Sequence, residues 1–452
     1  MAGERSTRRR FLQGLGGTAV GSAVVTGASG ESRAASGDEE SWPQFGYDAA
    51  NTGHAPDNTG PAGDLREQWS APLSGFLIGY GSLPVVDGVV YAGIFGVNGS
   101  RTTAQLFALD ATDGTEQWAT ERSTYSSGPE VSTPPVVVDG TVYVGANDYM
   151  LYALDATDGT EQWSFRADGH DVGAPTVADS TVYVGSFDLE TGAATAYALD
   201  AEDGAEQWTF RADAPMEDDS EHMGGTPAVG DGTVYIGSNT SKTNEGTLYA
   251  LDAGDGTKQW DFKTDDTMDT SPAVVDRTVY VGGYDDTVYA LDAGDGTEQW
   301  SVQTDGEVWS SPAVVDGTVY VGSYDGTVYA LDAGDGTEQW TFQTDGVVNE
   351  SPAVVDGTVY VGSSKLYALD AEDGIELGSF NPEGDVETSP AVVDGTVYIG
   401  DSWDNVYSVV EESERSTDFL TEIPLIALSI GGLGSAGAGA WLYKRYRDAS
   451  DE

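Results

Sequence analysis

The stretch Tyr289–Trp300 reads YALDAGDGTEQW, and the same residues return at Tyr329–Trp340. A second phrase, PAVVDGTVYVG at Pro312–Gly322, alternates with it along most of the chain. Both phrases combine alternating Val, Tyr and Ala residues with Asp-Gly pairs. Such alternation indicates strands, and Asp-Gly supplies the turn residues that tolerate positive φ. The two phrases therefore predict a series of β-hairpins.

The PAVVDGTVYVG phrase occurs eight times, and one turn aspartate marks each copy. Four strands in a repeat of about 40 residues are typical of a propeller blade. The sequence therefore predicts an all-β fold, an eight-bladed β-propeller of four-stranded antiparallel blades over residues 66–410. The eight turn aspartates are Asp87, Asp139, Asp179, Asp231, Asp276, Asp316, Asp356 and Asp394.

The last repeat is incomplete. Its third strand, Val406–Val410, runs directly into Glu411, and no fourth strand follows. The missing strand has its match at the other end of the repeats, where Arg66–Trp69 reads as a fourth strand with nothing before it. Pairing these two segments would close the ring and leave no sheet edge between its ends.

A residue string that recurs in nearly every blade cannot define one site, because a single ligand breaks the symmetry of the ring. Function must come from what differs between blades. The connection between second and third strands is nine residues from Tyr320 to Tyr329 but 16 from Tyr91 to Phe107. The link between blades also varies, from 12 residues between Trp300 and Pro312 to 17 between Trp118 and Pro135. The insertions in these two connections all fall on one face, in blades one to four, where long loops favour binding. We expect a partner to bind there; the alternative is drift in tolerant loops.

The composition restricts the partners and the chemistry. Asp and Glu total 76 against 19 Lys and Arg, which gives a net charge of −57 and argues against nucleic acid as a partner. Molar salt screens such repulsion, so the acidity indicates a halophilic, archaeon-like source. Cys is absent, which excludes a disulfide, a thiol nucleophile and a Cys-zinc site.

The two ends of the chain indicate export and a membrane anchor. Arg8 and Arg9, followed by a mildly apolar stretch, resemble a twin-arginine signal peptide over residues 1–35. After a stalk at 411–422, residues 423–443 carry no charge and are long enough for a transmembrane helix. The basic residues in the tail 444–452 place that tail in the cytoplasm and the propeller outside the cell membrane.

The phrase Ala290–Trp300 also resembles the tryptophan-docking motif of quinoprotein-type propellers, Ala-x-Asp-x-x-Thr-Gly-x-x-x-Trp, with Asp295 in place of Thr. In the lead-in, residues 36–65, Trp42–Gly46 and Asn51–Gly53 resemble the segment that precedes the propeller in this family. The resemblance implies that each docking Trp wedges between neighbouring blades. Gly378 stands at the eighth equivalent position, so one junction lacks its wedge. The docking residues are Trp69, Trp118, Trp163, Trp208, Trp260, Trp300 and Trp340.

Dehydrogenases of that family hold pyrroloquinoline quinone (PQQ) and calcium over the channel, which makes a PQQ- and calcium-dependent dehydrogenase one hypothesis. The resemblance implies Trp309, Asn349 and Glu350 as cofactor-binding candidates. Asp269, Asn349 and Glu387 are then the candidate metal ligands, since oxygen ligands suit calcium. However, an acidic chain places carboxylates on every loop, and the adjacent cysteines common in the family are absent. His54, His170 and His222 are too scattered in sequence to suggest a catalytic set.

The other hypothesis is a non-enzymatic scaffold with no catalytic residues and no cofactor. In blade number and motif the chain resembles the propeller lipoprotein of the bacterial outer-membrane assembly machine. The sequence therefore favours an exported, membrane-anchored propeller that binds a cell-surface protein or ligand through the loops of blades one to four.

Overall fold

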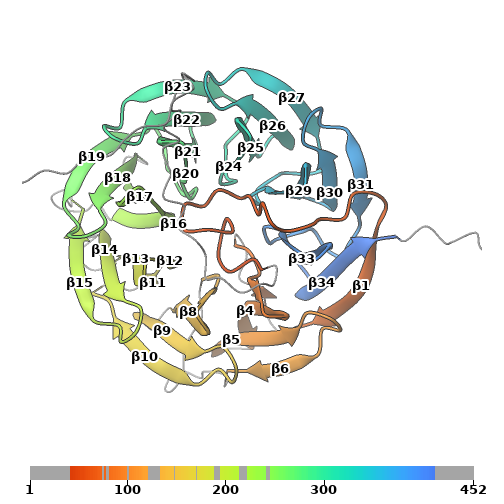
Figure 1. Ribbon diagram of the computed structural model, residues 1–452, viewed down its shortest axis with the longest axis horizontal. Coiled ribbons are helices and arrows are strands. Elements are labelled where there is room, and N and C mark those ends of the chain that lie inside the picture. The colour runs from red at the N-terminus through yellow and green to blue at the C-terminus, as the bar shows by residue number, and fades with distance from the viewer. Residues whose placement is uncertain are drawn as a thin grey trace, which may run out of the picture.

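The computed structural model describes residues 41–412, except 74–75, 78–80, 99–100, 121–132, 147, 169–170, 188–193, 213–220 and 241–244. In this part of the chain the strands form eight antiparallel sheets arranged in a ring (Figure 1). The prediction of an all-β, eight-bladed propeller with four-stranded blades is confirmed. In two blades the first strand is split into two short pieces that pair with the same second strand.

Blades one to four follow each other along the chain. Blade one contains β2 (Phe76–Leu77), β3 (Val85–Val86), β4 (Val89–Asn98), β5 (Arg101–Asp110) and β6 (Glu116–Ala119). Blade two contains β7 (Val136–Val138), β8 (Thr141–Gly145), β9 (Met150–Asp155) and β10 (Glu161–Arg166). Blade three contains β11 (Asp171–Val172), β12 (Thr176–Ala178), β13 (Thr181–Phe187), β14 (Ala194–Asp200) and β15 (Glu206–Arg211). Blade four contains β16 (Glu221–Gly230), β17 (Thr233–Thr240), β18 (Gly246–Asp252) and β19 (Lys258–Lys263).

Blades five to eight are more regular. Blade five contains β20 (Ala273–Val275), β21 (Thr278–Gly283), β22 (Thr287–Asp292) and β23 (Glu298–Gln303). Blade six contains β24 (Ala313–Val315), β25 (Thr318–Gly322), β26 (Thr327–Asp332) and β27 (Glu338–Gln343). Blade seven contains β28 (Ala353–Val355), β29 (Thr358–Gly362), β30 (Leu366–Asp370) and β31 (Glu376–Phe380). Blade eight contains β32 (Ala391–Val393), β33 (Thr396–Gly400), β34 (Asn405–Glu411) and β1 (Leu65–Pro72).

The ring closes through the N-terminal strand, as the sequence predicts. β1 pairs with β34 in antiparallel register, from Leu65 opposite Glu411 to Pro72 opposite Asn405. A bulge between Glu67 and Trp69 interrupts this ladder, and β10 has the same bulge between Glu161 and Trp163. The first strand of the propeller thus has the geometry of an ordinary fourth strand, although it precedes the other strands in the chain.

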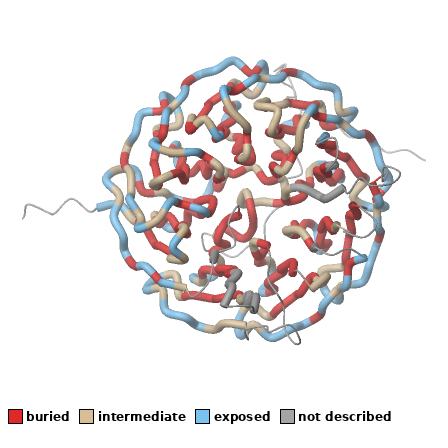
Figure 2. Tube along the Cα trace, turned by 180° about the vertical axis from the view of Figure 1, so that it is seen from behind, coloured by how far each residue is buried: buried red, intermediate tan, exposed pale blue. Residues whose placement is uncertain are grey.

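The Asp-Gly turns have the conformation that their residues predict. Asp316 and Gly317 have φ values of 49° and 80°, and a two-residue hairpin turn of type I′ requires positive φ at both positions. Burial follows the ring: buried residues lie in the interior and exposed residues along the outer rim (Figure 2). Core clusters join strands of neighbouring blades, as where Val288 of blade five and Leu331 of blade six share one cluster.

The lead-in segment, residues 41–64, runs across the interior of the ring before β1 begins (Figure 1). It reaches the first strand of every blade. In five blades the backbone N–H of a first-strand valine donates to a lead-in carbonyl: Val137 to Pro43, Val229 to Ala49, Val274 to Ala50, Val314 to Thr52 and Val354 to Gly53. Trp42 and Val85 exchange two backbone hydrogen bonds, Val177 donates to the Gln44 side chain, and the Asn58 amide donates to Val392.

The lead-in lies toward the face that carries the Asp-Gly turns. The backbone N–H of Gly395, the turn glycine of blade eight, donates to the carbonyl of Thr59. The charge of turn residue Asp316 raises the pKa of His54, against the larger lowering by burial. We call this the turn face, and the face with the other two connections the variable face. The lead-in therefore occupies the turn-face end of the central channel.

The insertions of blade one continue the strands rather than form a loop. β4 and β5 pair from Val89 opposite Asp110 to Asn98 opposite Arg101, so the long connection is an extended hairpin. In blade four the first and second strands, β16 and β17, are both extended and pair as far as Glu221 opposite Thr240. The long connection between Tyr91 and Phe107, where the sequence predicts a binding loop, therefore belongs mostly to strands.

Several predictions concern residues outside the described part of the chain. The signal peptide at 1–35, most of the stalk, the transmembrane helix at 423–443 and the cytoplasmic tail at 444–452 belong to this group, as does His170. No helix long and apolar enough to cross a bilayer occurs within the described residues.

Candidate functional site

The docking tryptophans form the contacts between blades. Each indole N–H donates to an alanine carbonyl of the next blade at 2.8–3.1 Å, as Trp300 does to Ala333. Each ring also covers a glycine with positive φ in that blade; a Cβ on Gly114 would lie 2.6 Å from Trp69. These seven residues therefore act in the architecture of the ring and not in one ligand site.

A tyrosine of the second strand shares each of these carbonyls, a role that the sequence analysis missed. The hydroxyl of Tyr280 donates to Ala333 at 3.1 Å, beside the bond from Trp300. The same pairing occurs at all seven tryptophan junctions. This role could have been inferred from the sequence, because a tyrosine occupies this position in every copy of the PAVVDGTVYVG phrase.

At the junction between blades seven and eight, another segment fills the place of the tryptophan. Gly378 replaces the tryptophan, and a Cβ there would lie 1.8 Å from the carbonyl oxygen of Gly63 in the lead-in. The corresponding tyrosine, Tyr360, is fully buried and donates to the carbonyl of Pro61 at 2.8 Å. The predicted gap is therefore filled by lead-in backbone.

The candidate cofactor residues stand at equivalent positions on the variable face. Asp269, Trp309, Asn349 and Glu387 each come two residues before the serine of a Ser-Pro pair that leads into a first strand. They come from four successive blades and lie around the mouth of the channel. Glu387 is near enough to Glu350, the neighbour of Asn349, for their charges to interact. Glu350 occupies the next position along, between Asn349 and Ser351.

Trp309 is packed between other aromatic side chains. Its ring stacks on Tyr284 with centroids 4.9 Å apart and an interplanar angle of 6°, and it contacts Tyr324 at 5.4 Å. Its indole N–H donates to Glu307 at 2.7 Å. A cofactor ring that stacked on Trp309 would have to compete with these tyrosines.

Asp269 has a structural partner. The side-chain amide of the buried Asn239 in β17 donates to the Asp269 carboxylate, and the Asn239 carbonyl accepts the backbone N–H of Met268 at 2.6 Å. This arrangement ties the second strand of blade four to the link between blades four and five.

Glu350 is the most unusual of these residues. At its position four other blades have a hydroxyl that accepts the backbone N–H of a second-strand glycine: Thr133 from Gly145, Thr270 from Gly282, Ser310 from Gly322 and Thr388 from Gly400. The Glu350 side chain is 3% exposed, and its carboxylate accepts a long 3.5 Å bond from Ser389. Burial, with the charge of Glu387, raises the pKa of Glu350 to about 8.

Two observations bear on the calcium and quinone hypothesis. The side-chain oxygen Oδ1 of Asn349 is buried without a hydrogen-bond partner in the described structure, and such an unpaired atom is a feature of a ligand site. However, calcium takes roughly 6–8 oxygen ligands. Among the described residues, no group of three or more His, Cys, Asp or Glu side chains could hold a metal ion. The described residues therefore show no assembled metal site, and Asn349 and Glu350 remain candidates.

The variable face carries exposed aromatic residues on its regular half. Tyr324 in the β25–β26 turn is 50% exposed, and Trp403 in the β33–β34 turn is 64% exposed. Val347, in the link between blades six and seven, is 39% exposed. Turns on a rigid scaffold are where binding residues often lie.

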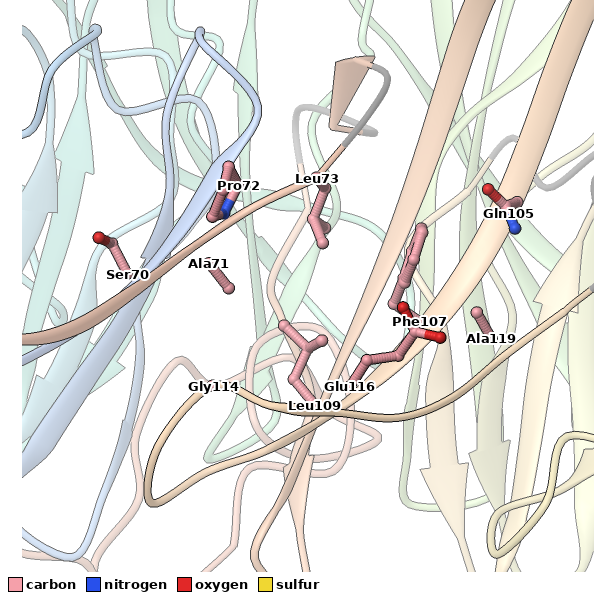
Figure 3. Close-up of a pocket in the computed structure, with 10 residues that line it drawn as sticks. All are labelled: Ser70, Ala71, Pro72, Leu73, Gln105, Phe107, Leu109, Gly114, Glu116 and Ala119. Carbon is pink, nitrogen blue, oxygen red and sulfur yellow. The ribbon is translucent and has the colours of Figure 1, made fainter.

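A groove of about 490 Å³ lies between blades eight and one. Figure 3 shows its lining: Ser70–Pro72 from β1 with the adjoining Leu73, and residues of β5, β6 and the turn between them. Its floor is apolar, since Ala71, Phe107 and Leu109 belong to one buried cluster. The groove lies at the site of ring closure and away from the residues at the channel mouth.

Comparisons with solved structures show the same fold. Quinohemoprotein alcohol dehydrogenase from Comamonas testosteroni is 18% identical with a TM-score of 0.65, over 83% of this chain and 81% of that one. BamB from Moraxella catarrhalis is 18% identical with a TM-score of 0.57, over 76% and 99%. A europium-containing methanol dehydrogenase is 16% identical with a TM-score of 0.67, over 80% and 89%. No curated protein matches the chain.

Scaffold and dehydrogenase are thus both compatible with the fold. The family model for outer membrane protein assembly factor BamB matches residues 63–174, 102–244 and 244–417, which together span nearly all the blades. The chain therefore belongs to the family of outer membrane protein assembly factor BamB.

Proposed function

We propose that this protein is an exported, membrane-anchored propeller that acts as a non-enzymatic binding or assembly scaffold at the cell surface. The observation that carries the proposal is the difference between the two faces of the ring. The turn-face end of the channel is occupied by the lead-in, whereas the variable face carries the lengthened hairpins of blades one, three and four and the exposed Tyr324 and Trp403.

Export and anchoring rest on the sequence. The twin-arginine pattern at Arg8 and Arg9 and the uncharged segment 423–443 support an ectodomain outside the membrane. The net charge of −57 supports a working environment of concentrated salt. We expect the melting temperature to fall steeply between about 3 M and about 0.1 M salt, since screening changes over that range. A constant melting temperature would contradict the halophilic part of the proposal.

Site-specific photo-cross-linking on whole cells tests the scaffold function. A photoreactive residue at Tyr324 reports on the variable face, and one at Ile375 reports on the turn face; both side chains are at least half exposed. We expect a discrete adduct from position 324 and none from position 375. Equal adducts at both positions, or none at Tyr324, would argue against a partner on the variable face.

A second experiment shortens the β4–β5 hairpin to the default length. The shortening removes the outer strand pairs from Phe95 opposite Ala104 to Asn98 opposite Arg101. Some stability should be lost with their ladder hydrogen bonds, so the melting temperature of the variant is measured alongside the adduct to show that it is folded. The adduct at position 324 should weaken if the partner spans both halves of the variable face. An unchanged adduct would confine the partner to blades five to eight.

The dehydrogenase hypothesis has its own test. The purified full-length protein is mixed with PQQ and calcium in concentrated salt, and the absorbance of the quinone is followed through gel filtration. We expect no co-elution, because an acidic chain places carboxylates on every loop and the adjacent cysteines common among these dehydrogenases are absent. Quinone that co-elutes with wild type but not with Asn349→Ala would favour the dehydrogenase instead.

A further inference from the structure

The groove between blades eight and one occupies a place that other junctions fill with an aromatic ring. In five blades a phenylalanine two residues after the docking position packs edge-on against a third-strand tyrosine of the next blade. The centroid distances are 5.2–5.5 Å and the interplanar angles 58–68°. These pairs are Phe165–Tyr197, Phe210–Tyr249, Phe262–Tyr289, Phe342–Tyr367 and Phe380–Tyr407.

At the closing junction the equivalent residue is Ala71. The register shows the equivalence, since Ala71 lies opposite Val406 in β34 as Phe165 lies opposite Leu151 in β9. The residue across the junction is Phe107 in place of tyrosine. In other blades the tyrosine hydroxyl accepts a backbone N–H, as Tyr367 does from Asp345. The closing junction therefore lacks one ring, and the ring opposite has no hydroxyl.

We propose that this groove binds an aromatic side chain presented by an extended, basic segment of a protein partner. The repeat itself identifies the occupant, because five junctions of the same molecule show a phenyl ring in this place. The volume of about 490 Å³ also falls in the range of about 300–1,000 Å³ that is usual for ligand pockets.

The rim of the groove suits a peptide. Ser70 and Glu116 are exposed and Gln105 is half-buried, so polar groups border the apolar floor. Aromatic side chains combine a large apolar area with few rotatable bonds, which makes them effective anchors in such pockets. The carboxylate of Glu116 on the rim favours a basic residue beside the ring, at a contact distance where salt screens least.

Such binding would also strengthen the closure of the ring. The occupant would contact β1 of blade eight and β5 of blade one together, and it would bind only while both blades are in place. A ligand that binds only the closed state stabilises that state. The proposal concerns the side of the ring and does not depend on a partner at the variable face.

Methyl NMR of the full-length protein with labelled alanines tests the proposal. The probe is the peptide Lys-Gly-Phe-Gly-Lys, and Lys-Gly-Ala-Gly-Lys has the same charge without the ring. We expect the Phe peptide to shift the methyl signals of Ala71 and Ala119, which line the groove. The Ala peptide should leave both signals unchanged. Equal shifts with the two peptides would overturn the proposal, because charge alone would then explain them.

Two variants locate the site. Ala71→Phe supplies the missing ring from the chain itself, so the shift of Ala119 should be lost and the melting temperature should rise. Val302→Phe makes the same kind of change at the equivalent position of blade five, and it should keep the shift. A response that persists in Ala71→Phe, or disappears in Val302→Phe, rules out this groove. If Ala71→Phe does not fold, Ala71→Leu should reduce the response in part, and a full response would count against the proposal.

Discussion

Two junctions between blades are filled by different groups. One lies between blades five and six, and the other between blades seven and eight. At the first, Trp300 and Tyr280 of blade five donate to the same carbonyl, Ala333, and the indole covers Gly336 of blade six. At the second, Gly378 makes room for the lead-in, and Tyr360 donates to Pro61. A repeat position can therefore lose its most characteristic side chain when another segment fills the same space.

Restoring the repeat should break the second junction. Gly378→Trp would match the other seven junctions in sequence, but even a Cβ would lie 1.8 Å from Gly63. We expect a loss of more than about 4 kcal/mol in the free energy of unfolding, or a protein that no longer closes. Urea denaturation in concentrated salt measures the loss. If Gly378→Trp were as stable as wild type, the lead-in would not fill this junction.

Removing the indole should break the first junction. Trp300→Ala deletes a buried ring and its hydrogen bond, and we expect it to cost about 3–5 kcal/mol. Trp300→Phe keeps most of the packing and should cost clearly less. The comparison of the two variants separates packing from the N–H bond, and a cost below about 1 kcal/mol for Trp300→Ala would contradict the docking role.

Blade seven also departs from the repeat at Glu350, and this departure should appear in the pH dependence. The folded pKa of about 8 lies above the ordinary value, so folding favours the protonated acid. Stability should therefore fall as the pH rises from about 4.5 toward 8. Glu350→Gln should remove this loss and gain on the order of 2–4 kcal/mol above pH 8, with little gain at pH 4. Ser310→Ala in blade six is the control, since it should lower stability equally at both pH values.

The smallest expected losses of stability come from removing the hydroxyl of a second-strand tyrosine, at Tyr320 or at Tyr360. Tyr320→Phe leaves the Ala371 carbonyl bonded to Trp340, so it should cost only about 0.5–1 kcal/mol. Tyr360→Phe removes the donor from the carbonyl of the buried Pro61, and it should cost about 1–3 kcal/mol. Equal costs for the two variants would mean that the Pro61 carbonyl finds another donor.

The repeated features of this molecule could be predicted from its sequence. The eight turn aspartates give the number of blades, and Arg66–Trp69 gives the closing strand, because both follow the repeat. The path of the lead-in could not be predicted. It occurs once, and most of its bonds go to backbone N–H groups, which carry no residue signature.

The candidate site was harder to predict than the fold, because carboxylates are frequent everywhere in this chain. The packing of Trp309 against Tyr284 and Tyr324 could have been inferred from the sequence, because both tyrosines follow the TVYVG phrase at the same position in successive blades. The groove could also have been inferred from the sequence, since Ala71 stands where five other copies have phenylalanine. Both patterns appear only when repeats are compared position by position.

The lead-in has a consequence for biosynthesis. It is made before any blade, yet Asn58 bonds to Val392, 334 residues later in the chain, and β1 must wait for β34. Contacts this distant form slowly, because a long loop must close first. A chain truncated before blade eight would leave both the lead-in and β1 without their final partners. The lead-in and β1 can therefore complete their hydrogen bonds only after blade eight has been synthesised, so the ring closes only in a full-length propeller.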